Sequence, residues 1–196
     1  MLDLKDISKT FHAGTVNEKT ALDGLSLHLN EGDFVTVIGG NGAGKSTMLN
    51  AVAGVWPVVE GTIEIDGVNV TKFPEYKRAS YLGRVFQDPM NGTAATMQIE
   101  ENMALASRRG KFRSLRKGIT SKEREFYREQ LKTLGLGLED RMTSKVGLLS
   151  GGQRQALTLL MATLKRPRLL LLDEHTAALD PKTAAKVLEL TDQIVQ

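Results

Sequence analysis

The chain has 196 residues and a formal net charge of +3, with 41% hydrophobic and 25% charged residues, which are ordinary values for a globular domain. It contains no cysteine, which excludes disulfides and thiol chemistry. No stretch approaches the roughly 20 apolar residues that cross a bilayer, and residues 1–20 lack a signal-peptide core, so we expect a soluble chain that reaches any membrane through a partner.

The first part of the chain predicts β-structure. Residues 25–29, Leu-Ser-Leu-His-Leu, alternate in the manner of a half-buried strand. Residues 34–38, Phe-Val-Thr-Val-Ile, are apolar and partly β-branched, as is typical of a buried strand. Residues 63–68 predict another short strand, bounded by glycines.

A glycine-rich turn joins the strand predicted at 34–38 to a helix that is predicted from residue 48 onward. A strand, such a turn and Gly-Lys-Ser opening a helix form a phosphate-binding loop. Glycines let several backbone N–H groups face one anion, and the helix N-terminus adds its positive end. We expect Lys45 to contact the terminal phosphates and the Ser46 hydroxyl to bind Mg²⁺. The predicted loop comprises Gly39, Gly40, Asn41, Gly42, Ala43, Gly44, Lys45, Ser46 and Thr47; a glycine-rich turn with a surface lysine is the alternative.

A second motif follows a short apolar run near the end of the chain. Residues 169–172 are four leucines, too few for a helix, and they predict a strand that is buried on both faces. Ligands of parallel sheets lie beyond the carboxyl ends of the strands. There, Asp173 is placed to hold Mg²⁺ and Glu174 to polarise an attacking water as general base. An acidic pair in solvent is the alternative.

A third motif, Leu-Ser-Gly-Gly-Gln-Arg-Gln at 149–155, precedes a stretch rich in alanine and leucine that predicts a helix. Ser150 is the expected N-cap, and the following glycines leave the helix N-terminus accessible to an anion. One nucleotide cannot easily contact both this helix N-terminus and that of the phosphate loop within one chain. In two copies packed head to tail, the signature of each copy could contact the phosphates bound by the other. The residues concerned are Ser150, Gly151, Gly152 and Gln153; a simple helix cap is the alternative.

Together these three motifs resemble those of the ATP-binding cassette (ABC) family, over essentially all 196 residues. The resemblance implies an α/β fold of the P-loop NTPase type, with a mostly parallel core sheet, an N-terminal antiparallel β-subdomain and an inserted α-helical subdomain. It places the core and β-subdomain at about 1–88 and 160–196, and the helical subdomain with the signature motif at about 89–159.

The same resemblance implies further roles. Phe11 matches the aromatic residue that stacks on adenine, and Gln87 matches the glutamine that senses Mg²⁺ and takes part in catalysis with Lys45 and Glu174. Asp180 matches an aspartate that communicates across a dimer. ATP and Mg²⁺ are the implied cofactors. A core aromatic for Phe11 and a polar strand end for Gln87 remain the alternatives.

Two departures from the family pattern affect catalysis. His175 stands where the family usually has proline. It is either a tolerated loop residue or an extra catalytic base. The family also carries a histidine roughly thirty residues beyond the catalytic glutamate, whereas this sequence stops 22 residues after Glu174, within a predicted amphipathic helix at 182–196. His12, His28 and His175 cannot replace it by position, so we interpret the sequence as truncated, which puts its turnover in question.

The function implied by the resemblance is that of an ATP-hydrolysing subunit that powers solute transport, with bacterial importers as the nearest pattern. Its expected partners are a second copy, transmembrane permease subunits and a solute-binding protein, at the cytoplasmic face of the cell membrane. One alternative is a non-transport ABC ATPase of the ribosome or chromosome, although a second cassette and a coiled coil are missing here. Another is a nucleotide-binding remnant without turnover.

The positive charge is concentrated in residues 107–118, which hold six Lys or Arg residues and no acidic residue. The rest of the chain has 20 basic and 23 acidic residues, so no basic surface extends over the whole molecule. This segment is either a solvated loop or a contact for anionic lipid or for the permease. Because only Phe112 interrupts it as an aromatic residue, no nucleic acid partner is expected.

Overall fold

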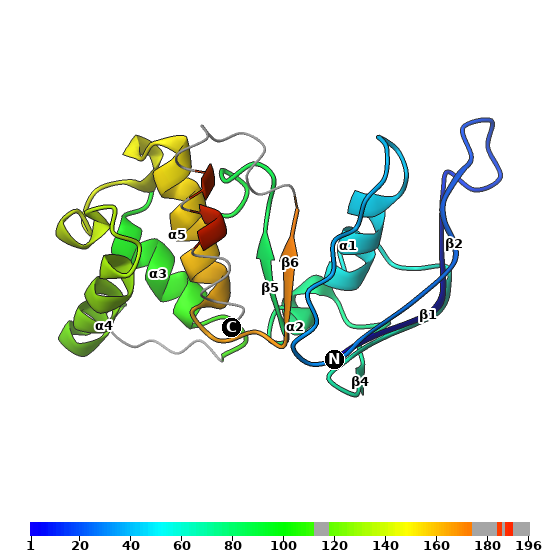
Figure 1. Cartoon of the computed structure of the whole chain (residues 1–196), viewed down its shortest axis with the longest axis horizontal. Helices are drawn as coiled ribbons and strands as arrows, with labels where there is room; N and C mark the ends of the chain where they lie inside the picture. Colours follow the sequence, from blue (N-terminus) through cyan, green and yellow to red (C-terminus); the bar gives the residue numbers. More distant parts are fainter. Residues whose placement is uncertain (112–117, 174–183, 186, 190–196) are drawn as a thin grey trace. The chain divides into compact units, whose positions relative to one another are not determined.

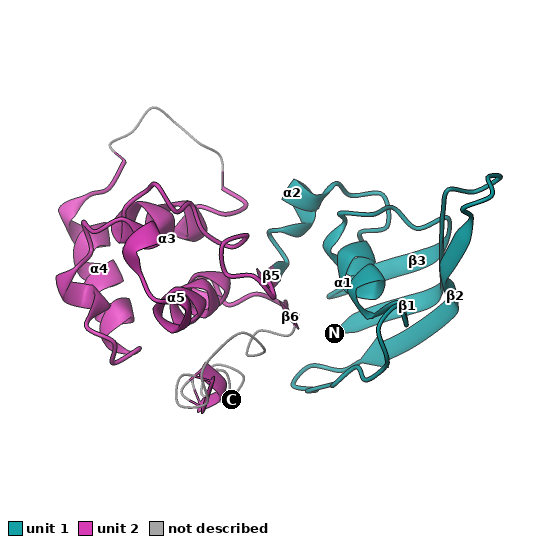
Figure 2. Ribbon diagram, turned by 90° about the horizontal axis from the view of Figure 1, so that it is seen from above, with its two compact units in different colours: residues 1–82 teal, residues 83–196 magenta. Residues whose placement is uncertain are grey.

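The computed structural model describes residues 1–111, 118–173, 184–185 and 187–189 of the chain (Figure 1). The chain divides into two units, Met1–Leu82 and Gly83–Gln196, which Figure 2 colours separately. In the described parts, no helix has both the length and the apolar character that a membrane span needs.

An antiparallel sheet forms most of the first unit. Its strands are β1 (Leu2–Phe11), β2 (Lys19–Leu29), β3 (Glu60–Ile65) and β4 (Val68–Asn69), in the order β2-β1-β3-β4. In register, Leu2 faces Leu29 on β2 and Ile65 on β3. The alternation at 25–29 is thus confirmed as part of β2, while the run at 63–68 is a hairpin that turns at residues 66–67.

Two helices belong to the same unit, α1 (Lys45–Ala53) and α2 (Glu75–Arg78). Arg78 is 2% exposed, and its guanidinium donates to the carbonyls of Ala51 (2.7 Å) and Val52 (3.0 Å) at the end of α1. It also donates to the carbonyls of Thr71 and Phe73. A helix end leaves carbonyls such as that of Val52 without an intrahelical partner, and Arg78 supplies one. Because its guanidinium also bonds to residues 71 and 73, Arg78 holds α1 against the chain segment that precedes α2.

Residues 34–38 belong to no strand, contrary to the expectation from their composition. Phe34 is 67% exposed and Ile38 is 90% exposed. A strand exists only where a neighbour supplies hydrogen bonds, and the sheet of residues 1–82 consists of β1 to β4 alone. An apolar, β-branched run favours a strand but does not provide that neighbour.

The second unit pairs β5 (Leu82–Val85) with β6 (Leu169–Leu172), and the two arrows point the same way in Figure 1. The strand predicted at 169–172 is therefore confirmed. The backbone N–H of Asp173 donates to the carbonyl of Val85 at 3.1 Å, which extends the pairing by one residue.

Helices make up the remainder of this unit: α3 (Ile99–Ser107), α4 (Ser121–Lys132) and α5 (Gly151–Thr163), with 3-10 turns η1 (Leu138–Asp140) and η2 (Val146–Leu148). α5 is buried over most of its length, which explains its alanine and leucine content. It packs in one core with Met103, Tyr127, Leu131 and Val187. The antiparallel N-terminal sheet, the parallel pair and these helices confirm the expected α/β class.

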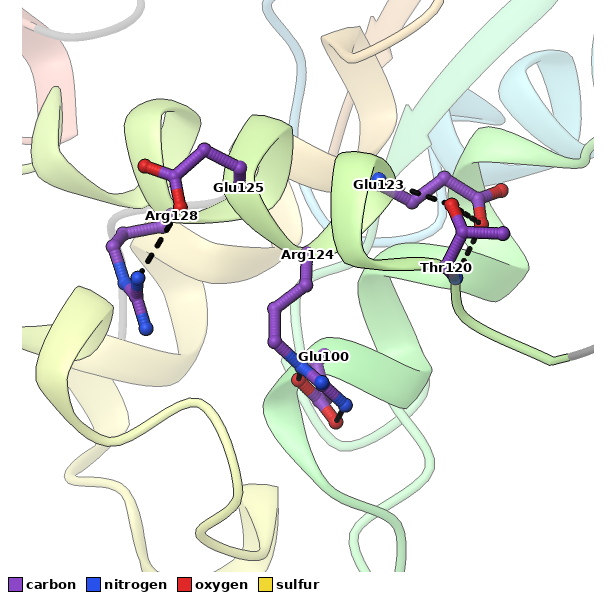
Figure 3. Close-up of polar contacts among 6 residues, drawn as sticks. All are labelled: Glu100, Thr120, Glu123, Arg124, Glu125 and Arg128. Carbon is purple, nitrogen blue, oxygen red and sulfur yellow. Dashed lines mark hydrogen bonds and ion pairs between the residues drawn. The ribbon is translucent and has the colours of Figure 1, made fainter.

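Polar side chains join α3 to α4, as Figure 3 shows. Glu100 is 4% exposed and receives two hydrogen bonds from the guanidinium of Arg124, from Nε at 2.7 Å and from Nη2 at 2.8 Å. At the start of α4, Thr120 and Glu123 cap the helix reciprocally. The bidentate geometry matches a guanidinium to a carboxylate and fixes how the two helices meet.

Candidate functional site

The phosphate loop of the first unit is shaped by its backbone. Gly44 is the N-cap of α1 and has a φ of 89°, and a Cβ atom there would lie 2.6 Å from the carbonyl oxygen of Ala21. Gly42 has a φ of 82°. Both positions need glycine, because other residues rarely adopt this conformation. No side chain caps the N-terminus of α1 in the described chain, so its first N–H groups remain available to an anion.

Two lysines lie beside this loop. The ammonium group of Lys45 donates to the carbonyl oxygens of Gly39 at 2.6 Å and Gly40 at 3.1 Å. The Nζ atom of Lys19, on β2, lies 3.7 Å from the place that a Cβ would take at Gly42. Sequence reasoning identified Lys45 through its motif but missed Lys19, because no motif marks it. The next residue after Lys45, Ser46, offers its hydroxyl at the start of α1.

Phe11 is the last residue of β1, where it pairs with Lys19 on β2. It is half-buried, and Trp56 packs against it edge-on, with ring centroids 5.0 Å apart and the ring planes at 85°. The ammonium of Lys9 lies 5.2 Å from the Phe11 centroid. The ring thus occupies the end of a strand, and Trp56 is a neighbour that no sequence signal indicated.

In the second unit, two predicted residues follow neighbouring parallel strands. Gln87 is exposed and lies two residues beyond β5, whereas Asp173 is half-buried directly after β6. The carboxyl ends of parallel strands meet at one edge of a sheet, the usual place for ligands. Glu174, His175 and Asp180 lie outside the described residues.

The described residues contain no group of three or more His, Asp or Glu side chains that could hold a metal ion. Mg²⁺ at a nucleotide keeps several waters and is bound through one or two carboxylates together with phosphate oxygens. Ser46, Gln87 and Asp173 offer hydroxyl, amide and carboxylate oxygens of the kind that Mg²⁺ prefers.

The signature motif opens α5 as expected. The hydroxyl of Ser150 accepts a hydrogen bond from the backbone N–H of Gln153 at 3.2 Å, and the Gln153 side chain accepts from the backbone N–H of Ser150 at 3.2 Å. This capping box leaves the N–H groups of Gly151, which is exposed, and Gly152, which is buried, without an intrahelical acceptor. The cap predicted at Ser150 is confirmed.

Arg154 is a residue at this site that sequence reasoning missed. A cation in the first turn of a helix faces the positive end of the helix dipole, which is unfavourable by itself. Here its Nη2 atom donates to the carbonyl of Gly147 at 3.1 Å and to that of Leu149 at 3.3 Å. Arg154 therefore fixes the turn that leads into Ser150.

The histidine at position 28 contacts two side chains in the first unit. Its Nδ1 lies 2.7 Å from a carboxylate oxygen of Asp3, and its Nε2 lies 3.2 Å from the side-chain oxygen of Asn30. Both contacts raise the pKa of His28, the one to Asp3 most strongly. The His28 side chain thus links β2 to Asp3 on the neighbouring strand β1, and His28 lies on a strand as predicted.

Comparisons with known proteins identify the family. Residues 22–177 match the family model described as "ABC transporter". The tyrosine transport ATP-binding protein of Clostridioides difficile (strain R20291) is 44% identical over 196 residues, which cover 100% of this chain and 78% of that protein. The methionine import ATP-binding protein MetN of Vibrio vulnificus (strain YJ016) is 32% identical over 199 residues. The match covers 99% of this chain but 54% of that protein, so the chain spans about half the length of this relative.

Solved structures agree with the fold. A dimeric post-hydrolysis state of the ATP-binding cassette MJ0796 bound to ADP and Pi superimposes with a TM-score of 0.83 at 31% identity, covering 100% of this chain and 83% of that one. A nucleotide-free cassette from an ABC transporter matches with a TM-score of 0.79 at 24% identity, covering 100% of this chain and 77% of that one, which supports the fold alone. The P-loop motif, the capped signature helix and these relatives lead to one conclusion: the chain belongs to the ABC transporter family and is an ATP-binding cassette ATPase.

Proposed function

We propose that this chain hydrolyses ATP to power the import of a small solute in a bacterium. The observation that carries the proposal is the start of α1, where glycines shape the loop, no described side chain caps the helix and Lys45 lies across the loop. Such a helix end binds phosphate through backbone N–H groups and its dipole. Relatives named for tyrosine transport and methionine import support an amino-acid-like solute.

In this proposal the loop residues 39–47 hold the phosphates of ATP, and Phe11 stacks on the adenine. Ser150, Gly151, Gly152 and Gln153 act on ATP bound by a second copy, packed head to tail, and Asp180 communicates across that dimer. The similar cassette MJ0796 is dimeric in its ADP-bound structure, which supports such a pair. The signature lies in a helical subdomain at about 89–159, and the core spans about 1–88 and 160–196.

For hydrolysis we assign the general base to Glu174, which takes a proton from the attacking water. Ser46, Gln87 and Asp173 would hold Mg²⁺, with Gln87 and Lys45 also acting in catalysis. When bound, the ion neutralises charge on the phosphate oxygens. The ammonium group of Lys45 stabilises the same negative charge on the phosphate oxygens. The loop amides orient the phosphates.

The proposed assembly lies at the cytoplasmic face of the cell membrane. Permease subunits would supply the membrane-spanning part, and a solute-binding protein would deliver the solute. The names of the relatives support a place in a transport system without specifying these partners. The permease and the solute-binding protein, rather than this chain, would choose the solute.

The proposed function is tested with Glu174→Gln. Removing the base while keeping the shape should leave ATP binding within about twofold and slow phosphate release by roughly 10²–10⁴-fold. ATP that is bound but not hydrolysed should then favour a dimer in size-exclusion chromatography. Undiminished turnover in the variant, together with a monomer in the presence of ATP, would refute the roles of Glu174 and of the second copy.

A further inference from the structure

We propose that Trp56 positions the ring on which the nucleobase stacks. The inference rests on the proposed function, in which Phe11 is that ring. Trp56 makes no assigned contact with ATP; instead, it fixes the orientation of Phe11 and links this ring to the helix that follows the phosphate loop.

The first support is the geometry of the two rings. Phe11 is the last residue of β1, and its side chain is half-buried. The Trp56 ring meets it at 85° with centroids 5.0 Å apart, which is the edge-to-face arrangement that aromatic pairs prefer. Because the positive edge of one ring meets the negative face of the other, the contact restrains rotation as well as position.

The second support is the anchoring of Trp56 itself. Gly54 ends α1 in a left-handed conformation, and its backbone N–H donates to the carbonyl of Ala51. The N–H groups of Val55 and Trp56 both donate to the carbonyl of Asn50, at 3.0 and 3.4 Å. Trp56 is therefore held on the last turn of α1, whose first turn carries Lys45 and Ser46.

The third support is a contact from β1 to the same segment. Lys9 donates from Nζ to the carbonyl of Pro57 at 2.8 Å, and the same ammonium lies 5.2 Å from the Phe11 centroid. Lys9 thus joins strand β1 to the segment after α1 next to the ring pair. A shift of Trp56 would move Phe11 relative to α1, and hence the base relative to the phosphates.

The chain offers a direct probe, because Trp56 is its only tryptophan. Its intrinsic emission therefore reports this site alone. We expect ATP to change the emission of the unmodified chain, whereas inorganic tripolyphosphate, which has no base, should change it much less. An equal response to the two ligands, or none to ATP, would overturn the inference.

Affinity is then compared among variants by titration calorimetry with the same two ligands. Trp56→Leu should weaken ATP binding by about 3- to 10-fold, the range for an aromatic pair, and leave tripolyphosphate binding within about twofold. Trp56→Phe keeps an aromatic edge and should restore ATP affinity. A thermal unfolding curve without ligand checks that each variant folds; if Trp56→Leu does not, the emission test and Trp56→Phe decide.

Phe11→Ala separates failure of the inference from failure of the proposed function. If Phe11→Ala binds ATP as tightly as the unmodified chain, the role of Phe11 is wrong and the inference falls with it. If Phe11→Ala weakens ATP binding but Trp56→Leu does not, only the positioning role of Trp56 is wrong. If Trp56→Leu weakens both ligands equally, Trp56 acts through the folding of α1, and the inference is again overturned.

Discussion

The helix that follows the phosphate loop begins differently from the helices of residues 83–196. α1 starts at a glycine in a left-handed conformation and has no side-chain cap. α4 and α5 start with reciprocal capping boxes, Thr120 with Glu123 and Ser150 with Gln153. In α3, the Glu101 carboxylate accepts from the backbone N–H of Gln98 at 2.7 Å.

This difference separates a helix start that lacks an acceptor within the chain from helix starts that the chain's own side chains satisfy. Backbone N–H groups in the first turn of a helix need acceptors, and a capping side chain supplies one from within the chain. α4 and α5 use their own side chains, which stabilises each helix without a ligand. α1 lacks such an acceptor among the described residues, so an anion is the natural one. The capped start of α5 also predicts that the signature contributes less to ATP affinity than the loop does.

The largest expected effect on ATP affinity comes from Lys45→Ala at the open helix end. The change removes a charge-assisted contact to phosphate, of a kind worth about 1.5–3 kcal/mol, which is roughly 10- to 150-fold in affinity. Titration with a fluorescent ATP analogue measures it. Lys72→Ala, at an exposed lysine of the same unit, serves as the control and should bind normally.

Lys45 also donates to the Gly39 and Gly40 carbonyls, so loss of affinity could arise from a disturbed loop. Thermal unfolding of Lys45→Ala without nucleotide distinguishes the two causes. A large drop in unfolding temperature would assign the effect to the loop. Unchanged ATP affinity would contradict the phosphate role altogether.

A smaller effect is expected for Ser150→Ala at a capped end. Loss of the cap should cost about 1 kcal/mol of stability, within a range of roughly 0.5–2 kcal/mol. ATP affinity should change by less than about twofold, whereas turnover should fall because the proposed second copy loses a phosphate contact. Phosphate release and urea unfolding are the measurements.

Thr120→Ala is the matched control, because Thr120 caps α4 in the same way, accepting from the Glu123 N–H at 3.2 Å. It should lower stability by a similar amount and leave turnover unchanged. If both variants lose turnover equally, the effect of Ser150→Ala is purely structural. The contrast between a ligand-facing cap and a structural cap would then be wrong.

The smallest effect concerns the free energy of unfolding at low pH, to which the ion pair between Glu100 and Arg124 contributes. Hydrogen bonds from the Arg124 guanidinium hold the pKa of Glu100 below its usual range, although burial opposes this shift. The pair's contribution is therefore complete above the unfolded pKa of about 4.3 and is lost as pH falls through the lowered pKa of the folded state.

In the Glu100→Gln variant, the free energy of unfolding should fall less steeply with decreasing pH over this acid range. The change in slope should correspond to less than one proton bound on unfolding. Urea unfolding midpoints measured from about pH 6 to pH 3 test this. Glu129→Gln is the control, since Glu129 is exposed and pairs with Lys132 within one helix. An identical acid decline in Glu100→Gln and the unmodified chain would contradict the assigned role of the Glu100–Arg124 pair.

The sequence by itself determined the features that depend on neighbours along the chain. The glycine-rich loop, the β6 strand of four leucines and the cap at Ser150 follow from residues within a few positions of one another. Local conformation and helix capping are set by φ preferences and by side chains that reach their own backbone. The three motifs at their spacing were sufficient to indicate the family.

Tertiary structure alone decided the contacts between distant segments. Arg78 reaches the end of α1 across 27 positions, and Arg124 reaches Glu100 across 24. Trp56 meets Phe11 only because β1 and the end of α1 lie together. Residues 34–38 show the converse, since their composition favours a strand but no described strand of residues 1–82 pairs with them. Such contacts depend on packing, because a side chain's partner is chosen by the space that the whole fold leaves around it.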